Sequence, residues 1–275
     1  MSTLSTVPFD DRGLAYGDGV FETVLLRGGQ PVLWQYHRAR LLRGCATLAI
    51  SPPSDQALEA CWQASSGQAS DTGLEVLKII VTRGSGGRGY ACPPDPAPRL
   101  LSHRSSFTPI PQRWREGISV CVCQLRLGHQ PLLAGIKHLN RLENVMARRE
   151  CQHPAIAEGL LADQQGNLIE ATSMNVFWQA GGRLWTPELE QCGVAGTLRA
   201  ALLEQGWVRE GTLPLSSLQD VERLWVANSV QGVWPVTVLV SSTTGEHLQR
   251  LPLAADDPLQ ALAHPLMGYP PDNAG

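Results

Sequence analysis

Two side chains in this 275-residue sequence carry a primary amine, Lys78 and Lys137, and the other 20 of its 22 Lys and Arg residues are arginines. A primary amine condenses reversibly with an aldehyde, so such chemistry has only these two candidates. Lys78 lies in the middle of a predicted strand, where a lysine that reaches out to solvent is the ordinary explanation. Lys137 follows an apolar stretch and precedes a predicted helix. We therefore take Lys137 as the candidate reactive lysine, with an ordinary surface lysine as the alternative.

A glycine-rich segment, residues 84–89, matches the G-x-G-x-x-G pattern of dinucleotide-binding proteins and directly follows a predicted strand. In those proteins a helix begins where the pattern ends, and its N–H groups hold the pyrophosphate. Here residues 90–96 contain three prolines, which a helix interior does not accommodate. The pattern therefore argues against an NAD-dependent dehydrogenase, and we expect a flexible loop that is able to contact an anionic substrate.

Hydrophobic periodicity predicts alternating strands and helices in the first third of the chain, and mainly strands joined by glycine turns afterwards. The strand at residues 74–82 has few polar breaks, which suits burial on both faces. Six prolines between residues 93 and 115 mark the expected domain junction. Helices are expected at residues 36–49, 55–66, 141–151 and 197–205, and strands at residues 20–27, 31–34, 74–82, 99–105, 118–125, 159–163, 168–170, 175–179, 183–186, 223–227 and 235–240.

Two regions carry more detailed expectations. In the helix expected at residues 141–151, Leu142, Val145 and Met146 form the predicted buried stripe. Asn140 and Glu143 before and within it resemble a capping box. The proline-containing tail from residue 265 is expected to be loosely held.

Composition argues against several classes of function. A net charge of −3 and a pI near 6.2 provide no basic surface for nucleic acid. No apolar run approaches the roughly 18 residues of a membrane span, and no secretory signal opens the chain, so we expect a cytoplasmic protein without a membrane partner. The seven cysteines show neither CxxC nor zinc-ligand spacing. We expect reduced thiols and no metal site.

Three segments resemble the signatures of fold-type IV pyridoxal-phosphate enzymes: residues 11–23 (DRGLAYGDGVFET), 137–144 (KHLNRLEN) and 170–177 (EATSMNVF). That family holds branched-chain and D-amino-acid aminotransferases and 4-amino-4-deoxychorismate lyase. The resemblance spans about residues 10–240. It implies an α+β fold of two domains and a homodimer with each active site near the subunit interface. The smaller N-terminal α/β domain would be residues 1–112, and the larger C-terminal β-rich pseudo-barrel domain, carrying the lysine, residues 113–275.

The resemblance also implies a role for particular residues with pyridoxal 5′-phosphate as cofactor. Lys137 matches the lysine that forms the Schiff base with the cofactor aldehyde, and Glu170 the carboxylate that faces the pyridine nitrogen. Arg40 matches the phosphate arginine, because a guanidinium pairs with phosphate through a fork of two N–H bonds. The remaining matches are further phosphate contacts: the backbone N–H groups of Thr197 and Leu198 at a helix start, and Ser229.

Within the family, residues 83–90 and 133–143 look most like the lyase. The resemblance thus implies elimination from 4-amino-4-deoxychorismate, giving 4-aminobenzoate and pyruvate for folate synthesis, with Lys137 as general base. Arg88 and Arg27 are candidate contacts for the two substrate carboxylates. Two alternatives stay open: a branched-chain or D-amino-acid aminotransferase, which starts with the same proton removal, and a binding protein of the same fold without catalytic activity.

Overall fold

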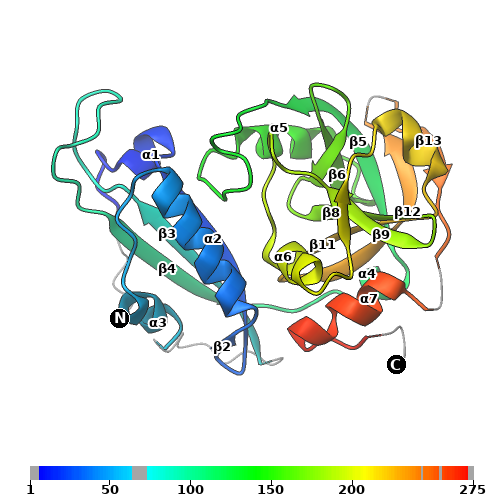
Figure 1. Cartoon of the computed structure of the whole chain (residues 1–275), viewed down its shortest axis with the longest axis horizontal. Helices are drawn as coiled ribbons and strands as arrows, with labels where there is room; N and C mark the ends of the chain where they lie inside the picture. The colour runs from blue at the N-terminus through cyan, green and yellow to red at the C-terminus, as the bar shows by residue number, and fades with distance from the viewer. Residues whose placement is uncertain (1–5, 64–72, 243, 254–255, 272–275) are drawn as a thin grey trace. The chain divides into compact units, whose positions relative to one another are not determined.

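The computed structural model describes residues 6–63, 73–242, 244–253 and 256–271 (Figure 1). The chain divides into two compact units, one of Met1–Thr108 with Ile136–Asn140 and the other of Pro109–Gly135 with Arg141–Gly275. The fold is α+β, as the sequence predicts. The boundary between residues 112 and 113 stays a prediction, and the short segment that contains Lys137 groups with the N-terminal unit. No helix within the described ranges has the length and apolar character needed to cross a membrane.

The first unit is built on an antiparallel sheet with strand order β2-β1-β3-β4. Alternate residues of β1, among them Val20, Val24 and Leu26, face a core that also receives Leu41 and Cys45 from α2. A strand that is buried on one face requires this alternation, because successive side chains point to opposite faces. The elements are α1 (Arg12–Tyr16), β1 (Gly19–Arg27), β2 (Gln30–Pro31), α2 (Trp34–Thr47), α3 (Asp55–Gln63), β3 (Leu74–Thr82) and β4 (Arg99–Ser106).

Two expectations for this unit are wrong in detail, and the end of a third element is not tested. The hairpin return ends at Pro31 because Leu33 takes a positive φ of 55° and α2 begins at the next residue. β3 is not buried on both faces, since Lys78 at its centre is exposed. α3 is described from Asp55 to Gln63, and the last residues predicted for that helix, 64–66, lie outside the described residues.

The second unit contains a nine-stranded mixed sheet with the order β10-β9-β8-β11-β12-β5-β6-β7, and β13 pairs with β12. β7 also pairs with β8 at Glu170 and Asn175, so the path from β8 to β7 closes on itself like a barrel. β5 runs parallel to both β6 and β12. The elements are α4 (Pro111–Arg115), β5 (Ile118–Leu127), α5 (Leu142–Glu150), β6 (Ile156–Asp163), β7 (Leu168–Ala171), β8 (Asn175–Ala180), β9 (Arg183–Pro187), α6 (Thr197–Glu204), β10 (Arg209–Gly211), the 3-10 helix η1 (Leu215–Asp220), β11 (Arg223–Asn228), β12 (Gly232–Ser241), β13 (His247–Arg250), α7 (Pro258–Ala263) and the 3-10 helix η2 (Pro265–Met267).

Helix α5 and the C-terminal tail differ from expectation. Leu142, Val145 and Met146 are 54–62% exposed, and the buried residue of α5 is Ala147. The capping box is also absent, because the carboxylate of Glu143 accepts from the backbone N–H of Gly128 instead. The described part of the tail, residues 265–271, is packed rather than loose, since buried Tyr269 donates its hydroxyl to Val230 O at 2.7 Å.

Candidate active site

Lys137 lies on a short segment that pairs with the start of β1 in the first unit. The Phe21 N–H donates to the Lys137 carbonyl at 2.9 Å, and Val20 forms a bridge with His138. The half-buried Lys137 places its Nζ 4.6 Å from the centroid of the Phe21 ring. Lys78, on β3, places its Nζ 5.3 Å from the same centroid. The two amines of the sequence thus meet at one aromatic ring, which attracts cations through its face. Reaching out to solvent therefore does not fully explain Lys78, because its amine also lies over the Phe21 ring.

Arg40 is held in a buried cluster of polar side chains in the same unit. Its Nε and Nη2 donate to the two carboxylate oxygens of Glu22 at 2.7 and 2.5 Å. His37 Nδ1 lies 2.6 Å from Glu22 Oε2. All three side chains are at most 7% exposed. Arg40 is therefore not an exposed charge on the surface of α2.

The charges in this cluster determine each protonation state. Burial alone would raise the pKa of Glu22, but the charge and hydrogen bonds of Arg40, with those of His37, hold it to about 2. Burial lowers the pKa of His37, and Arg40 and Lys137 add to the lowering while Glu22 opposes it. His37 is therefore neutral at pH 7 and donates its Nδ1–H to the ionised carboxylate. The sequence analysis missed Glu22 and His37, although an acidic residue at an inward position of a strand, between Val20 and Val24, is itself a signal.

The glycine loop after β3 contains no helix between residues 84 and 98, a stretch that is described throughout. The dinucleotide motif therefore fails, as predicted. The loop is tied down by the guanidinium of buried Arg12, which donates to the carbonyls of Gly89, Tyr90 and Ala91 at 3.1–3.2 Å. Arg12 in turn pairs with Asp18 at 2.9 Å. Because of these bonds, the loop is more restrained than the flexible glycine loop that the sequence suggests.

The two predicted substrate arginines lie far apart within this unit. Arg88 is exposed on the loop, which leaves β3 beside Gly19, where β1 begins. Arg27 is exposed at the other end of β1, eight residues along the strand. At about 3.3 Å per residue the two ends of β1 are about 26 Å apart, which argues against both arginines contacting one small molecule within this unit.

Glu170 occupies a defined position at the end of β7 in the second unit, where it is 4% exposed. Its Oε1 accepts from Asn144 Nδ2 of α5 at 3.0 Å, and its Oε2 accepts from the Val194 N–H at 2.8 Å. Asn175 holds the same turn through its Nδ2, which donates to Val194 O at 2.8 Å. Two N–H donors stabilise the ionised form of a carboxylate and fix its direction. The sequence analysis gave Asn144 no role, although it falls within the segment 137–144.

The turn from Gly193 to Gly196 leads into α6, whose first residues were predicted to hold phosphate. Gly196 is the N-cap and no side chain caps the helix, while Thr197 and Leu198 are buried. A Cβ at Gly196 would lie 1.8 Å from Asn175 Oδ1, so glycine is required there. Ser229 is buried in the turn between β11 and β12, where Asn228 Oδ1 accepts from the Val230 and Gln231 N–H groups. The structure therefore places Glu170, Thr197, Leu198 and Ser229 in the second unit, and Lys137 and Arg40 in the first.

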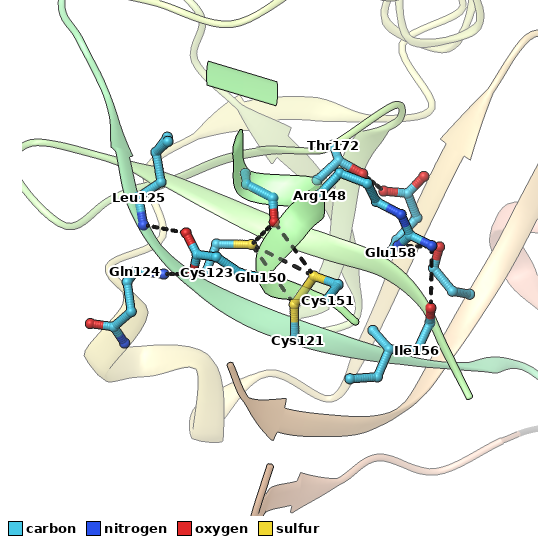
Figure 2. The surroundings of a disulfide bond; sticks show 12 residues. Cys121, Cys123, Gln124, Leu125, Arg148, Glu150, Cys151, Ile156, Glu158 and Thr172 are labelled. Carbon is cyan, nitrogen blue, oxygen red and sulfur yellow. Dashed lines mark hydrogen bonds between the residues drawn. A yellow bond between two sulfur atoms is a disulfide. The ribbon is translucent and has the colours of Figure 1, made fainter. Parts of the chain in front are cut away.

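The expectation that the cysteines are all reduced is wrong: Cys121 of β5 and Cys151 at the end of α5 form a disulfide (Figure 2). Cys123 Sγ lies 3.8 and 3.9 Å from the two bonded sulfurs. The same end of α5 is fastened by Glu150, whose carboxylate accepts from two consecutive N–H groups of β5, at Gln124 and Leu125 (Figure 2). Burial raises the pKa of Cys123 to about 12, with Glu150 and Glu158 adding to the rise, so it stays a thiol.

Comparison with known proteins assigns the chain to a family. The pattern of the family described as amino-transferase class IV matches residues 19–239. The chain belongs to that family. It is 36% identical over 237 residues to an aminodeoxychorismate lyase from Vibrio harveyi, a match that covers 84% of this chain and 86% of the relative. A second aminodeoxychorismate lyase, from Bacillus subtilis, is 26% identical over 94% of this chain and 90% of its own length. The crystal structure of 4-amino-4-deoxychorismate lyase from Pseudomonas aeruginosa is 39% identical, with a TM-score of 0.79 over 90% of this chain and 91% of that one.

Class IV aminotransferase family members use pyridoxal 5′-phosphate, and the side chains described above fit that cofactor. The cofactor presents an aldehyde, a pyridine nitrogen and a phosphate, which require an amine, a carboxylate and cationic or N–H donors respectively. Lys137 would supply the amine, and Glu170, which two donors direct, would supply the carboxylate. Arg40 and the N–H groups at the start of α6 would supply the phosphate donors. The protein is therefore a pyridoxal-phosphate enzyme.

Proposed function

We propose that this protein is an aminodeoxychorismate lyase, which eliminates pyruvate from 4-amino-4-deoxychorismate and leaves 4-aminobenzoate, a step of folate synthesis. The observation that carries the proposal is the difference in similarity. Identity reaches 36–39% with two lyases, while a third lyase at 26% and a branched-chain and a D-alanine aminotransferase at 25–28% are more distant. The aminotransferase reading remains the second candidate.

We propose that the site residues act as the family resemblance implies. Lys137 holds the cofactor covalently and Glu170 pairs with its pyridine nitrogen, while Arg40, the N–H groups of Thr197 and Leu198, and Ser229 bind its phosphate. Both Lys137 and Glu170 fall in segments that resemble the signatures of the family, which supports their acting on one cofactor.

When bound, pyridoxal phosphate supplies an electron sink for the pair of electrons released at substrate C4. The Lys137 amine, freed when the substrate amine replaces it, would take the C4 proton as general base. Glu170 keeps the proton on the pyridine nitrogen, which maintains the sink. Lys137, now an ammonium, returns a proton to the enolpyruvyl oxygen as the C3–O bond breaks. The ring becomes aromatic, and the released enol form of pyruvate takes the keto form.

For the substrate carboxylates, we propose Arg88 together with Lys78. Arg88 follows the strand end that lies beside the start of β1, and Lys78 shares the Phe21 ring with Lys137. Arg27 was the other candidate, but its position at the far end of β1 argues against it. The homodimer and the cytoplasmic location also stay predictions, to be tested by sedimentation and by cell fractionation.

The test is the reaction itself with purified protein and two kinds of substrate. With 4-amino-4-deoxychorismate, we expect pyruvate and 4-aminobenzoate in equal amounts, and no product from Lys137→Ala. With D-alanine or a branched-chain amino acid plus 2-oxoglutarate, we expect no turnover beyond trace. Efficient amino transfer without release of pyruvate would show that the enzyme is an aminotransferase and not a lyase. Failure of the purified protein to bind pyridoxal phosphate would exclude both enzyme activities and favour a binding protein of the same fold.

A further inference from the structure

We propose that Arg12 is a positioning residue for substrate binding: its buried guanidinium holds the glycine loop after β3 and thereby fixes the place of Arg88 on that loop. The inference rests on the proposed contact between Arg88 and a substrate carboxylate. Arg12 is assigned no substrate contact of its own and acts through Arg88. All of the residues involved lie in the first unit.

The guanidinium of Arg12 meets backbone carbonyls on both sides of Arg88. Its Nη1 and Nη2 donate to the carbonyl oxygens of Gly86 at 3.5 Å, Gly89 at 3.2 Å, Tyr90 at 3.2 Å and Ala91 at 3.1 Å. Because the N–H directions of a guanidinium are fixed in one plane, the carbonyls that meet it are also set in place. The backbone on either side of Arg88 is therefore held, and the Arg88 side chain is exposed on this held segment.

The loop has few side chains with which to fix its own shape. Glycine occupies four of the six positions at residues 84–89, and glycine has the greatest backbone freedom of all residues. Gly87, next to Arg88, has a φ of 78°, and a Cβ there would lie 2.3 Å from Ala91 O and 3.1 Å from Arg12 Nη1. The loop thus closes around the guanidinium where a side chain is missing. A loop of this composition depends on contacts such as those of Arg12 for a single shape.

Arg12 is itself anchored at the start of β1. It is 4% exposed, and its Nε donates to Asp18 Oδ2 at 2.9 Å. Asp18 also pairs with Arg83 at 2.8 Å, and it directly precedes β1, the strand that carries the Phe21 ring beside Lys137. Burial alone would raise the pKa of Asp18, but the hydrogen bonds and charges of Arg83 and Arg12 lower it, so the carboxylate is ionised at neutral pH. The loop is therefore tied to the end of β1 that lies near the candidate reactive lysine.

The contribution of Arg12 to substrate binding is positional. An arginine on a mobile loop loses loop and side-chain entropy when it pairs with a carboxylate, and a backbone that is already held removes part of that cost. The charge of Arg12 is not the explanation, because Asp18 offsets it at 2.9 Å and so weakens its attraction for a substrate carboxylate. A positional contribution disappears when Arg88 is removed, whereas a purely structural contribution remains.

The experiment measures kcat and KM of the holoenzyme with 4-amino-4-deoxychorismate for wild type, Arg12→Lys, Arg88→Ala and the double variant. Arg12→Lys keeps the positive charge beside Asp18, but a compact ammonium does not reproduce the planar fork that meets the carbonyls. Arg38→Lys, which alters an exposed ion pair with Asp55 in the same unit, is the matched control. Limited trypsin digestion with mass spectrometry measures the rate of cleavage after residue 88, and thermal unfolding reports folding separately.

We expect Arg12→Lys to lower kcat/KM about tenfold to a hundredfold, mainly through a higher KM, since a misplacement of about 1 Å costs up to this much. In the Arg88→Ala background, the same substitution should change kcat/KM by less than about twofold, because both changes remove one interaction. Trypsin should cleave Arg12→Lys after residue 88 about tenfold faster than wild type, the equivalent of about two lost hydrogen bonds. Arg38→Lys should match wild type in both measurements.

Two results would overturn the proposal. If the losses of Arg12→Lys and Arg88→Ala multiply in the double variant, Arg12 acts independently of Arg88 as a structural residue. If wild type and Arg12→Lys are cleaved at equal rates, the loop keeps its place without the guanidinium. Should Arg12→Lys not fold, Gly87→Ala decides, because its methyl group separates the exposed loop from Arg12 and leaves the buried guanidinium intact. It should show the same loss, the same dependence on Arg88 and the same fast cleavage.

These results are separable from the proposed function. If Arg88→Ala retains the wild-type kcat/KM, the proposed substrate contact of Arg88 fails, and the role of Arg12 in binding fails with it. If Arg88→Ala loses activity but Arg12→Lys keeps its kcat/KM and its slow cleavage, only the inference about Arg12 fails. If the enzyme instead transfers amino groups, the same variants are compared with the amino acid as substrate, which also carries a carboxylate.

Discussion

The disulfide between Cys121 and Cys151 should stabilise the second unit by an amount that follows from the length of the loop it closes. The two cysteines are 30 residues apart in sequence. On the chain-entropy account, closing a loop of this length in the unfolded chain is worth about 3.6 kcal/mol at 25 °C. For a protein above 150 residues, about 2–4 °C accompany each kcal/mol, so removing the bond should lower the melting temperature by about 7–15 °C.

The assay is thermal unfolding of wild type and of Cys121→Ser/Cys151→Ser, each with and without a reductant. Cys92→Ser, which changes an exposed cysteine outside the bond, is the matched control and should leave the melting temperature unchanged. Alkylation after unfolding without reductant should modify only the five free cysteines. Modification of all seven, together with a reductant-independent melting temperature, would refute the reasoning and restore the expectation of reduced thiols.

Three further outcomes are expected. Asn144→Ala removes a charge-assisted hydrogen bond to Glu170 worth about 1.5–3 kcal/mol, so kcat/KM should fall about 10-fold to 150-fold. Met146→Ala, on the exposed side of the same helix, should leave kcat/KM unchanged. An Asn144→Ala enzyme with unaltered kcat/KM would contradict the role of that bond. The pKa of Glu22 is lowered from 4.5 to about 2 on folding, so its contribution of about 3 kcal/mol to the free energy of unfolding is present above pH 4.5 and is lost as the pH falls toward 2. Acid unfolding of Glu22→Gln should lack this pH-dependent component. Identical acid-unfolding profiles for wild type and Glu22→Gln would count against it. Iodoacetamide at pH 8 should modify exposed Cys92 first, because burial raises the pKa of three of the buried thiols to about 11–12. Mass spectrometry measures the order of labelling. Buried thiols labelled as fast as Cys92 would contradict the expectation, because they would then be accessible.

Local patterns predicted the elements well where one face of an element is buried. β1 and β3 were located to within a residue, because alternation of side chains in a strand and its bounding turns are both visible in sequence. The same reasoning failed for α5, where Leu142, Val145 and Met146 have helical spacing but lie on the exposed side. An apolar stripe shows that a helix has two different faces, and tertiary packing decides which of them is covered.

Candidate site residues can be proposed from the sequence where a residue type is rare or belongs to a motif, as with Lys137 and Glu170, and their roles stay predictions. Their supporting partners could not be proposed in this way. Glu22 and Arg40 are 18 residues apart, and Asn144 and Glu170 are 26 apart, so these hydrogen bonds depend on tertiary folding. The pairing of Cys121 with Cys151 is of the same kind, since seven cysteines permit many pairings and spacing selects none of them.

Lys137 as the reactive lysine and elimination as the fate of the substrate are central to the proposed function. The direct measurement is pyruvate release from 4-amino-4-deoxychorismate, coupled to lactate dehydrogenase, with 4-aminobenzoate quantified in the same reaction. Wild type should release the two products in a one-to-one ratio, and Lys137→Ala, loaded with pyridoxal phosphate, should release neither. Pyruvate release that survives in Lys137→Ala, or consumption of the substrate by wild type without pyruvate, would contradict the account.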